Sequence, residues 1–376
     1  MMSKRFLLSA ARLAIPLLLP VVFVTGCERN PKPIKIGMAI NLSGRGGAAG
    51  EHIRDGALLA VDEVNKNGGI NGRPLLLLVR DDENSDEGIR RADASLVQAG
   101  VVAIIGHSYS SNTVKAYPYI TAHDTLMLTG YTATTKLSGK DDLFLRTSID
   151  CNLYGRKTAA LLAEKNVTAV SFLMDMSNAD FVLDYVEQVK KNYQGWITTV
   201  QFESRDNVDW HKVTTELMAK SPQAVVMLTE SSMTAVAAQK LRECRFSGTM
   251  IATIWSQSPE LIRIGGPATE GISIVSFINP ENRRPGYLDF SKKLQKHFGK
   301  TATARSARAY EMINILAQGL RKSSEINAGQ LKTALLKDNF NSILGPVQFD
   351  AYGDCIRPVY DVVVKDGRFT NGGEIY

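Results

Sequence analysis

Hydroxyl side chains cluster directly after a short apolar run at residues 101–105. Ser110, Ser111 and Thr113 stand where this strand-like run gives way to a segment with helical spacing. The first N–H groups of a helix lack partners within the helix and lie at the positive end of its dipole, so they favour an anion. Plain capping of the helix by Ser110 or Ser111 fits the same spacing. The pattern therefore predicts either a carboxylate site or a structural cap.

The same stretch is close to a nucleophile motif. Gly106-His107-Ser108-Tyr109-Ser110 differs at one position from the G-x-S-x-G turn that exposes the serine of many hydrolases. Ser110 stands where that turn needs its second glycine, and a side chain there crowds the turn. Because histidines follow later in the chain, a serine hydrolase with Ser108 as nucleophile stays open as an alternative.

A glycine-rich loop and the metal-binding residue types give weaker signals. Residues 44–50 fit the beginning of a G-x-G-x-x-A dinucleotide fingerprint, but Asp81 and Asp82, the next strand-ending acids, stand much further away than about 20 residues. These glycines instead predict a backbone that approaches a ligand or a facing lobe closely. No histidines are spaced i, i+4 and no cysteines are spaced CxxC. We expect neither a metal nor a cofactor.

Composition bounds the class of protein. The chain has 376 residues, with 44 Lys and Arg against 38 Asp and Glu, and three of the basic residues precede residue 27. The modest charge that remains does not favour a nucleic-acid partner. With 44% hydrophobic and 22% charged residues the chain is globular, and it exceeds the roughly 250–300 residues at which a single core stops growing. Two domains are expected.

Apolar runs alternate with segments of helical spacing along the chain. The expected strands are residues 34–42, 74–79, 101–105, 125–128, 169–174, 197–202, 224–228, 250–254 and 271–277, with short strands in 347–369. The expected helices are residues 51–67, 87–98, 111–122, 153–165, 181–191, 208–219, 233–244, 287–298, 304–322 and 331–336. Strands that are apolar throughout and are followed by helices indicate parallel sheets buried on both faces. The fold class is thus α/β, with two doubly wound parallel-sheet lobes joined by a hinge.

The predicted lobes are discontinuous in sequence. Residues 34–149 plus 278–346 form the first lobe, and residues 150–277 plus 347–376 form the second. In such lobes a ligand binds beyond the carboxyl ends of the strands.

The N-terminal segment is typical of an export signal. A basic start is followed by the apolar run Leu13–Val24, which is shorter than the about 20 residues of a membrane-spanning helix. The run ends in Val24-Thr25-Gly26-Cys27, which resembles a bacterial lipobox. Residues 1–26 are therefore predicted to be a signal peptide, Cys27 the lipidation site and residues 27–33 a tether, so the protein is expected to be exported and lipid-anchored to a bacterial membrane. A plain secretory cleavage site is the alternative.

Several further motifs follow one another in a fixed order. They are Ile34-Lys35-Ile36-Gly37, Leu42-Ser43-Gly44, the segment 67–75, Asp81-Asp82, Ile104-Ile105-Gly106-His107, Leu145-Arg146-Thr147, Glu270-Gly271, Tyr310, Gly345-Pro346 and Phe349-Asp350 with Gly353-Asp354. With these motifs the chain resembles, from Ile34 to Phe369, the leucine/isoleucine/valine-binding family of type I periplasmic binding proteins, the solute receptors of ABC importers. The resemblance implies no enzyme activity, a small-molecule ligand (an amino acid or a related carboxylate) and an ABC permease as partner. A ligand-sensing receptor of the same fold is the alternative.

The resemblance also assigns site residues. It places the ligand's α-carboxylate on Ser110 and the loop after the fourth strand around its polar groups. The chain departs from the family at Glu230, where a tyrosine is usual, and the family's acid falls near Ile254 or Trp255, so Glu230 is the expected partner of an ammonium group instead. A surface loop position is the alternative for these residues of the second lobe. The residues so assigned to the ligand are Ser110, Ser111, Tyr131, Thr132, Thr134, Glu230 and Trp255.

The cysteines depart from the family pattern. The family's early disulfide is absent, because its positions fall near Asn84 and Tyr109. Cys151 and Cys355 lie near expected lobe crossings and are the favoured pair among the remaining cysteines, with free buried thiols as the alternative.

Overall fold

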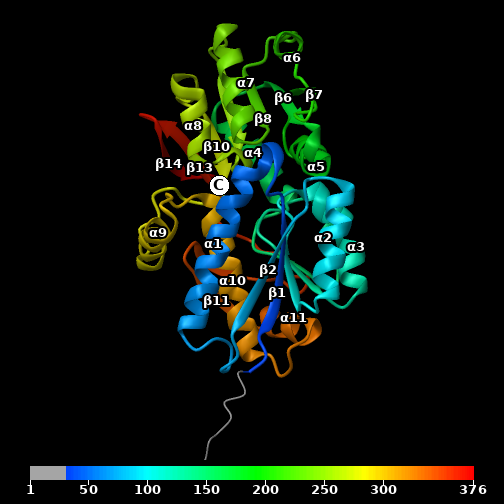
Figure 1. The fold of residues 1–376 in the computed structure, drawn as a ribbon. Helices are drawn as coiled ribbons and strands as arrows, with labels where there is room; N and C mark the ends of the chain where they lie inside the picture. The colour runs from blue at the N-terminus through cyan, green and yellow to red at the C-terminus, as the bar shows by residue number, and fades with distance from the viewer. Residues whose placement is uncertain (1–30) are drawn as a thin grey trace, which may run out of the picture. The chain divides into compact units, whose positions relative to one another are not determined.

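The computed structural model describes residues 31–376 and confirms the predicted α/β class (Figure 1). The first sheet has the strand order β2-β1-β3-β4-β5, and every neighbouring pair in it is parallel. Its strands are β1 (Ile34–Ile40), β2 (Leu75–Asp81), β3 (Ala103–Gly106), β4 (Leu126–Thr129) and β5 (Phe144–Arg146). The central strands form because their residues are apolar on both faces, so helices must cover the sheet on both sides.

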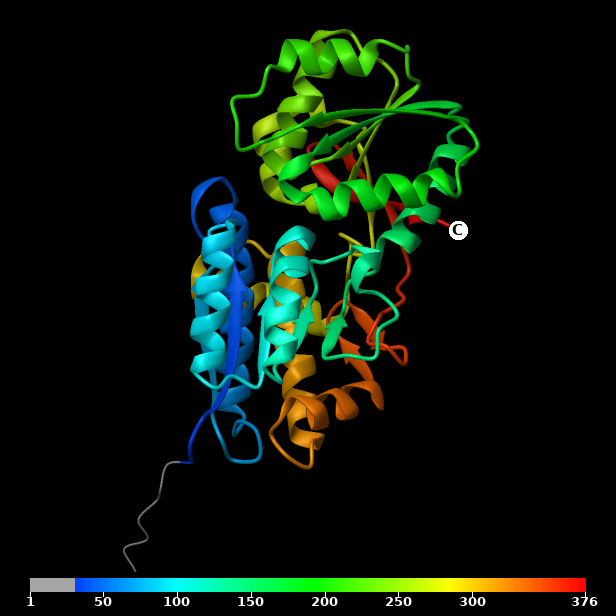
Figure 2. The ribbon, with the colours of Figure 1, turned by 90° about the vertical axis from the view of Figure 1, so that its right-hand side faces the viewer.

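Helices from both ends of the described chain cover this sheet. They are α1 (Gly47–Lys66), α2 (Asp86–Gln98), α3 (Ser110–Ala122), α9 (Pro285–Phe298), α10 (Ala304–Lys322) and α11 (Ala328–Leu336). α1, α9, α10 and α11 share one apolar cluster with the sheet, while α2 and α3 share another on its opposite face. Figure 2 shows the orange α11 region beside the blue and cyan elements, although they are far apart in sequence. A small antiparallel pair, β11 (Asn339–Ser342) and β12 (Gly345–Gln348), belongs to the same cluster.

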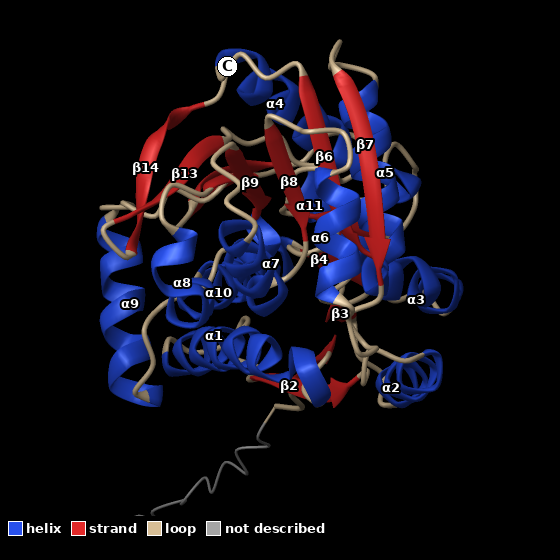
Figure 3. Cartoon of the chain, turned by 90° about the horizontal axis from the view of Figure 1, so that it is seen from above, coloured by secondary structure: helices blue, strands red, loops and turns tan. Residues whose placement is uncertain are grey.

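The second sheet has the order β14-β13-β10-β9-β8-β6-β7 (Figure 3). Its strands are β6 (Ala169–Asp175), β7 (Trp196–Phe202), β8 (Ala224–Leu228), β9 (Thr249–Thr253), β10 (Ser273–Ser276), β13 (Tyr360–Lys365) and β14 (Arg368–Glu374). Only the β10–β13 and β13–β14 pairings are antiparallel, so β13 and β14 add a two-stranded edge to a parallel sheet. One face packs against α4 (Cys151–Glu164) and α5 (Ala179–Lys190), and the other against α6 (Trp210–Met218), α7 (Ser231–Glu243) and α8 (Pro259–Gly265).

Short 3-10 turns follow several of the strands. They are η1 (Gly44–Gly46), η2 (Thr135–Leu137), η3 (Met176–Asn178), η4 (Ile254–Ser256) and η5 (Gly266–Thr269).

The chain passes between the two sheets after β5, after β10 and after β12. Near the last crossing, Phe349 and Cys355 pack in the first lobe's core, and Val359 packs in the second. We therefore propose the lobe boundaries expected from the sequence, with the third crossing moved from residue 347 to the segment after Cys355.

The predicted pairing of Cys151 with Cys355 is wrong. Both are free buried thiols, and Cys244 is a free exposed one. Cys151 lies in the core of the second lobe and Cys355 in that of the first. Their S–H groups donate to different carbonyls, those of Phe181 and Ile356, each at 3.8 Å.

The predicted signal peptide and Cys27 lie outside the described residues. Within residues 31–376, none of the helices combines the length and hydropathy needed to cross a bilayer.

Candidate binding site

A cavity opens where the carboxyl ends of strands from both sheets meet. Loops after β1, β3 and β4 contribute one wall, and those after β6, β8 and β9 contribute another, together with the start of α10. The lining residues are Gly46, Ala49, Ile53, Ser108, Tyr109, Tyr131, Ala133, Ser148, Tyr154, Asn178, Phe181, Glu230, Ile254, Trp255, Arg305 and Arg308. The enclosed space is about 50 Å³, and the whole hollow, including its opening to solvent, is about 660 Å³. This is the position at which open α/β sheets bind ligands.

Aromatic rings form much of the cavity wall. The Trp255 ring lies between Tyr109 of the first lobe and Phe181 of the second, with centroids 5.8 Å apart in both pairs. The interplanar angles of 89° and 88° are the edge-to-face arrangement that aromatic quadrupoles favour. The wall therefore joins the two lobes through apolar contacts and presents a surface suited to a flat or branched apolar group.

Two buried arginines enter the cavity from the first turns of α10. Arg305 is 6% exposed and donates from Nη2 to the Trp255 carbonyl at 2.7 Å and from Nη1 to Ser231 Oγ at 3.4 Å. Arg308 is 5% exposed and donates to the carbonyls of Ala304 and Gly130. Its guanidinium also lies over the Tyr131 ring, 4.5 Å from the centroid. Because Arg305 bonds to residues of the second lobe, it links the two halves of the cavity.

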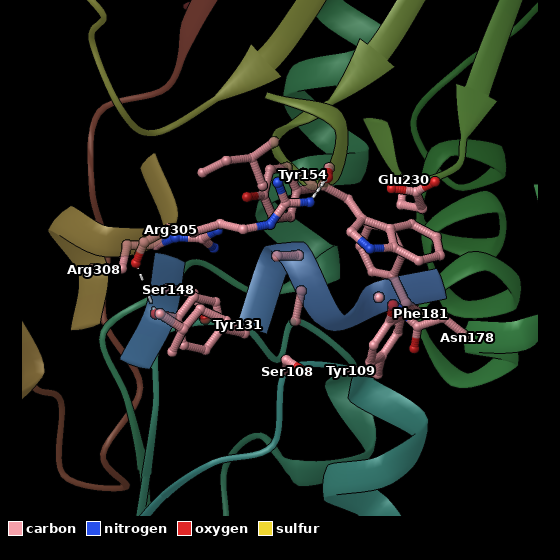
Figure 4. A pocket seen from close by; sticks show the side chains of 16 residues that line it. Ser108, Tyr109, Tyr131, Ser148, Tyr154, Asn178, Phe181, Glu230, Arg305 and Arg308 are labelled. Atoms are coloured by element: carbon pink, nitrogen blue, oxygen red, sulfur yellow. Dashed lines mark hydrogen bonds between the residues drawn. The ribbon is translucent and has the colours of Figure 1, made fainter. Parts of the chain in front are cut away.

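Electrostatics around the pair are unusual. Burial and, to a smaller extent, the charge of Arg305 lower the pKa of Arg308 to about 10, against the opposing effects of Tyr131 and Tyr154. Tyr154 is itself 1% exposed, and its hydroxyl has no hydrogen-bond partner within the described chain. Figure 4 shows the arginines toward one end of the cavity and Glu230 toward the other. The cavity thus has a cationic end with an unused hydroxyl nearby.

Glu230, at the opposite end of the cavity, caps a helix. It is the N-cap of α7, and its Oε1 accepts hydrogen bonds from the N–H groups of Ser232 and Met233, each at 3.1 Å. A carboxylate at a helix N-terminus is favoured by the dipole as well as by these bonds.

The other sequence-predicted residues divide into two groups. Tyr131, Glu230 and Trp255 line the cavity, whereas Ser110, Ser111, Thr132 and Thr134 are buried and are not among its lining residues.

Each hydroxyl of the second group has a partner within the protein. Ser110 Oγ accepts from the Ala133 N–H at 3.1 Å. Ser111 joins the lobes, because its N–H donates to Asn178 Oδ1 and its Oγ accepts from the Asp180 N–H. Thr132 pairs with Thr113, their hydroxyl oxygens being 2.6 Å apart, and Thr134 donates to Asp184 at 3.2 Å.

A fully buried cluster of charges lies directly beneath the wall of the cavity. The ring nitrogens of His107 lie 2.6 Å from Asp82 Oδ2 and 3.1 Å from Asp93 Oδ1. Both nitrogens are therefore committed and cannot serve Ser108 as a general base. Ser108 Oγ accepts from the Asn41 N–H at 3.5 Å.

Sequence reasoning missed Arg305, Arg308 and Tyr154. A signal for the arginines exists in the stretch Ala304-Arg305-Ser306-Ala307-Arg308, where small residues surround two arginines three positions apart. Small neighbours allow other elements to approach on every side, and all of residues 304–313 are buried. Arginines in such a helix must be buried too, which is rare unless they meet a partner.

These features define a two-lobed α/β protein that holds a small solute at the carboxyl ends of its parallel strands. The chain belongs to the periplasmic binding protein family, whose model matches residues 33–368. It is 23% identical to the leucine-, isoleucine-, valine-, threonine- and alanine-binding protein of Pseudomonas aeruginosa over 329 residues, which cover 85% of this chain and 87% of that relative.

Solved structures share the fold. The leucine-binding protein LivK from Thermotoga maritima has a TM-score of 0.83 at 22% identity and covers 91% of this chain and 98% of its own. A solute-binding protein of an ABC transporter from R. palustris, in complex with benzoate, has a TM-score of 0.80 at 16% identity and covers 91% and 96%. Such proteins bind substrates and are not enzymes, which confirms the expectation of binding without catalysis and leaves the hydrolase alternative unsupported.

Proposed function

We propose that this protein captures a small carboxylate-bearing solute between its lobes and delivers it to an ABC permease. The observation that carries the proposal is the pair of buried guanidinium groups in a cavity lined from both lobes. A solute that contacts both walls stabilises the closed arrangement by the contacts that exist only there.

The known proteins support a carboxylate in particular. The Pseudomonas aeruginosa relative is named for five amino acids, and the R. palustris protein holds benzoate. All of these solutes carry a carboxylate, while they differ in the presence of an ammonium group. An amino acid or a related carboxylate is therefore the proposed ligand class.

The test is a thermal-shift screen of the ligand-free protein against amino acids, aliphatic acids and aromatic acids. A ligand at about 100 times its dissociation constant adds roughly 2.7 kcal/mol to the free energy of unfolding. A carboxylate that raises the melting temperature, confirmed by calorimetric titration, supports the proposal. Binding only of uncharged solutes, or of none, contradicts it.

We further propose that the protein is exported and anchored by a lipid on Cys27, with residues 28–33 as a tether. The apolar run before Cys27 is too short to remain as a membrane span, and a lipobox-like sequence ends it. Mass spectrometry of membrane-extracted protein should find an acylated cysteine at the new N-terminus. A soluble form that begins at another residue contradicts this.

A further inference from the structure

The arginines of the cavity lack a counterion. Within residues 31–376 neither Arg305 nor Arg308 pairs with a carboxylate, and their bonds go to carbonyls and one hydroxyl. The nearby Glu311 pairs with Arg357 at 2.7 Å, and its charge contributes least among the groups that raise the pKa of Arg308. Two like charges so deeply buried are costly without an anion.

We propose that the solute is an aromatic carboxylate without an ammonium group, and that Arg305 and Arg308 select it. The inference rests on the proposed function, since it specifies the ligand class of the same cavity. The carboxylate lies at the arginine end, where guanidinium groups and the Tyr154 hydroxyl donate to it. The ring lies against the aromatic wall of Tyr109, Phe181 and Trp255.

An ammonium group has no good position in this cavity. The carbonyl of Gly130, in the loop after β4, already accepts from Arg308 Nη1 at 2.9 Å. A positive group near it would also meet the two guanidinium charges. The one acid among the lining residues is Glu230, whose Oε1 is used in capping α7. The single negative charge of Glu230 thus stands against two guanidinium charges, and the lining as a whole disfavours an ammonium.

The aromatic side chains that line the cavity favour an aromatic solute. Five of the lining side chains are aromatic: Tyr109, Tyr131, Tyr154, Phe181 and Trp255. Ring edges and faces from both lobes meet at Trp255, so a flat ring can make the edge-to-face contacts that these side chains already make with one another. An aliphatic chain of similar size gains burial but not these contacts.

The experiment uses matched pairs of ligands on the full protein. Calorimetric titration compares 3-phenylpropanoate with phenylalanine, and 4-methylpentanoate with leucine, so each pair differs only by the ammonium group. We expect the acid of each pair to bind at least tenfold more tightly than its amino acid, and 3-phenylpropanoate to bind more tightly than 4-methylpentanoate. Tighter binding of the amino acids overturns the inference while the proposed function stands. Binding of none of the four also overturns the inference, while the proposed function is then decided by the wider thermal-shift screen.

Variants then test the assignment of residues. Arg305→Met and Arg308→Met should each weaken 3-phenylpropanoate binding ten- to a hundredfold. Arg321→Met is the matched control, because Arg321 lies on the same helix and bonds to the Gly69 carbonyl away from the cavity. Thermal melting verifies folding, and Arg308→Lys, which keeps the charge, should recover part of the affinity. Affinity equal to that of the parent in both folded Met variants overturns the role of the arginines.

Discussion

Two groups of buried charges lie within a few residues of the cavity, and they differ in how they are neutralised. In the cluster of Asp82, His107 and Asp93, each ring nitrogen faces a carboxylate. The pair of Arg305 and Arg308 faces carbonyls and a tyrosine ring, with no carboxylate from the described chain. The first group is complete within the protein and holds a lobe together. The second has no carboxylate partner within residues 31–376, and we propose that the solute supplies one.

The pKa values express this difference. Burial alone would lower the pKa of His107, but the charge of Asp93 and the hydrogen bonds of both aspartates outweigh it and raise the pKa to about 10. The pKa of Arg308 is also about 10, but this value is lower than the ordinary 12.5 of arginine, because burial disfavours the charged form. The protein thus stabilises the cation of His107 and destabilises that of Arg308. We interpret the stabilised cation of His107 as structural. We interpret the destabilised cation of Arg308 as part of the binding site, where perturbed pKa values tend to occur.

The largest effect is expected for His107→Phe. The variant leaves Asp82 and Asp93 buried without a cation, and breaking a buried pair costs about 3–5 kcal/mol of the free energy of unfolding. Urea titration measures it. The control is Lys115→Met, which removes an exposed ion pair with Asp86 and should change the same quantity by less than about 1 kcal/mol. Parent-like stability of His107→Phe would show that the cluster is not structural.

The pH dependence of stability sharpens the same point. Because the pKa of His107 is raised, its stabilisation is complete below pH about 6.5 and is lost as the pH rises toward 10. The parent should therefore lose about 3 kcal/mol more than His107→Phe between pH 6.5 and 9. The pKa of Asp82 is lowered by His107 against the effect of burial, so its contribution is lost in acid, below its unfolded value of 3.8. Parallel stability curves for the two proteins above pH 6.5 would contradict this assignment.

The sequence predicted the architecture well because its signals are local and repetitive. Apolar runs and helical spacing predicted ten of the eleven α-helices found within residues 31–376, and α10 was predicted with its observed bounds, Ala304–Lys322. The missed helix, α8 (Pro259–Gly265), has only seven residues. Its sequence signals are the N-cap residue Ser258 and the proline that follows it. Two turns are too short for helical periodicity to emerge.

The site was harder to predict because its residues meet only after folding. Glu230 and Trp255 were proposed as ligand residues from the family resemblance, which places ligand contacts in the loops after two strands of the second sheet. Arg305 and Arg308 lie on a helix that returns to the first lobe from the end of the second, so no spacing along the sequence points to the cavity. Ser110 stays a prediction: its type and position suit an anion, while its hydroxyl accepts a hydrogen bond from the N–H of Ala133.

Ser110→Ala separates these two roles. Its hydroxyl accepts the hydrogen bond of a buried N–H, so the variant should lose about 1–3 kcal/mol of the free energy of unfolding. Ligand affinity should change less than threefold, because the hydroxyl does not line the cavity. Denaturant unfolding and calorimetric titration measure the two quantities. A ten- to hundredfold loss of affinity with unchanged stability would instead give Ser110 the carboxylate role implied by the family.

Arg308→Met is the counterpart of the His107 variant. Replacing an uncompensated buried charge by an apolar side chain of similar length removes a desolvation cost along with two hydrogen bonds to carbonyls. The ligand-free protein should therefore change its free energy of unfolding by no more than about 1 kcal/mol. Urea titration without ligand checks this, with Arg321→Met as control. A loss as large as that of His107→Phe would erase the distinction between the two groups.

The smallest effect on stability is expected for Glu230→Gln, yet it bears most directly on the ligand. The amide oxygen of glutamine can still cap α7, so the free energy of unfolding should fall by only about 0.5 kcal/mol, the part owed to the charge at the helix N-terminus. For an ammonium-free carboxylate the variant removes a like charge from the cavity, and affinity should stay equal or rise a few-fold. For an amino acid whose ammonium lies at Glu230, affinity should fall instead. Titrating the variant with phenylalanine and 3-phenylpropanoate therefore reads the sign of the charge that Glu230 faces. A selective loss of affinity for phenylalanine places an ammonium at Glu230. A gain of affinity for 3-phenylpropanoate leaves the two arginines as the only charged contacts of the solute.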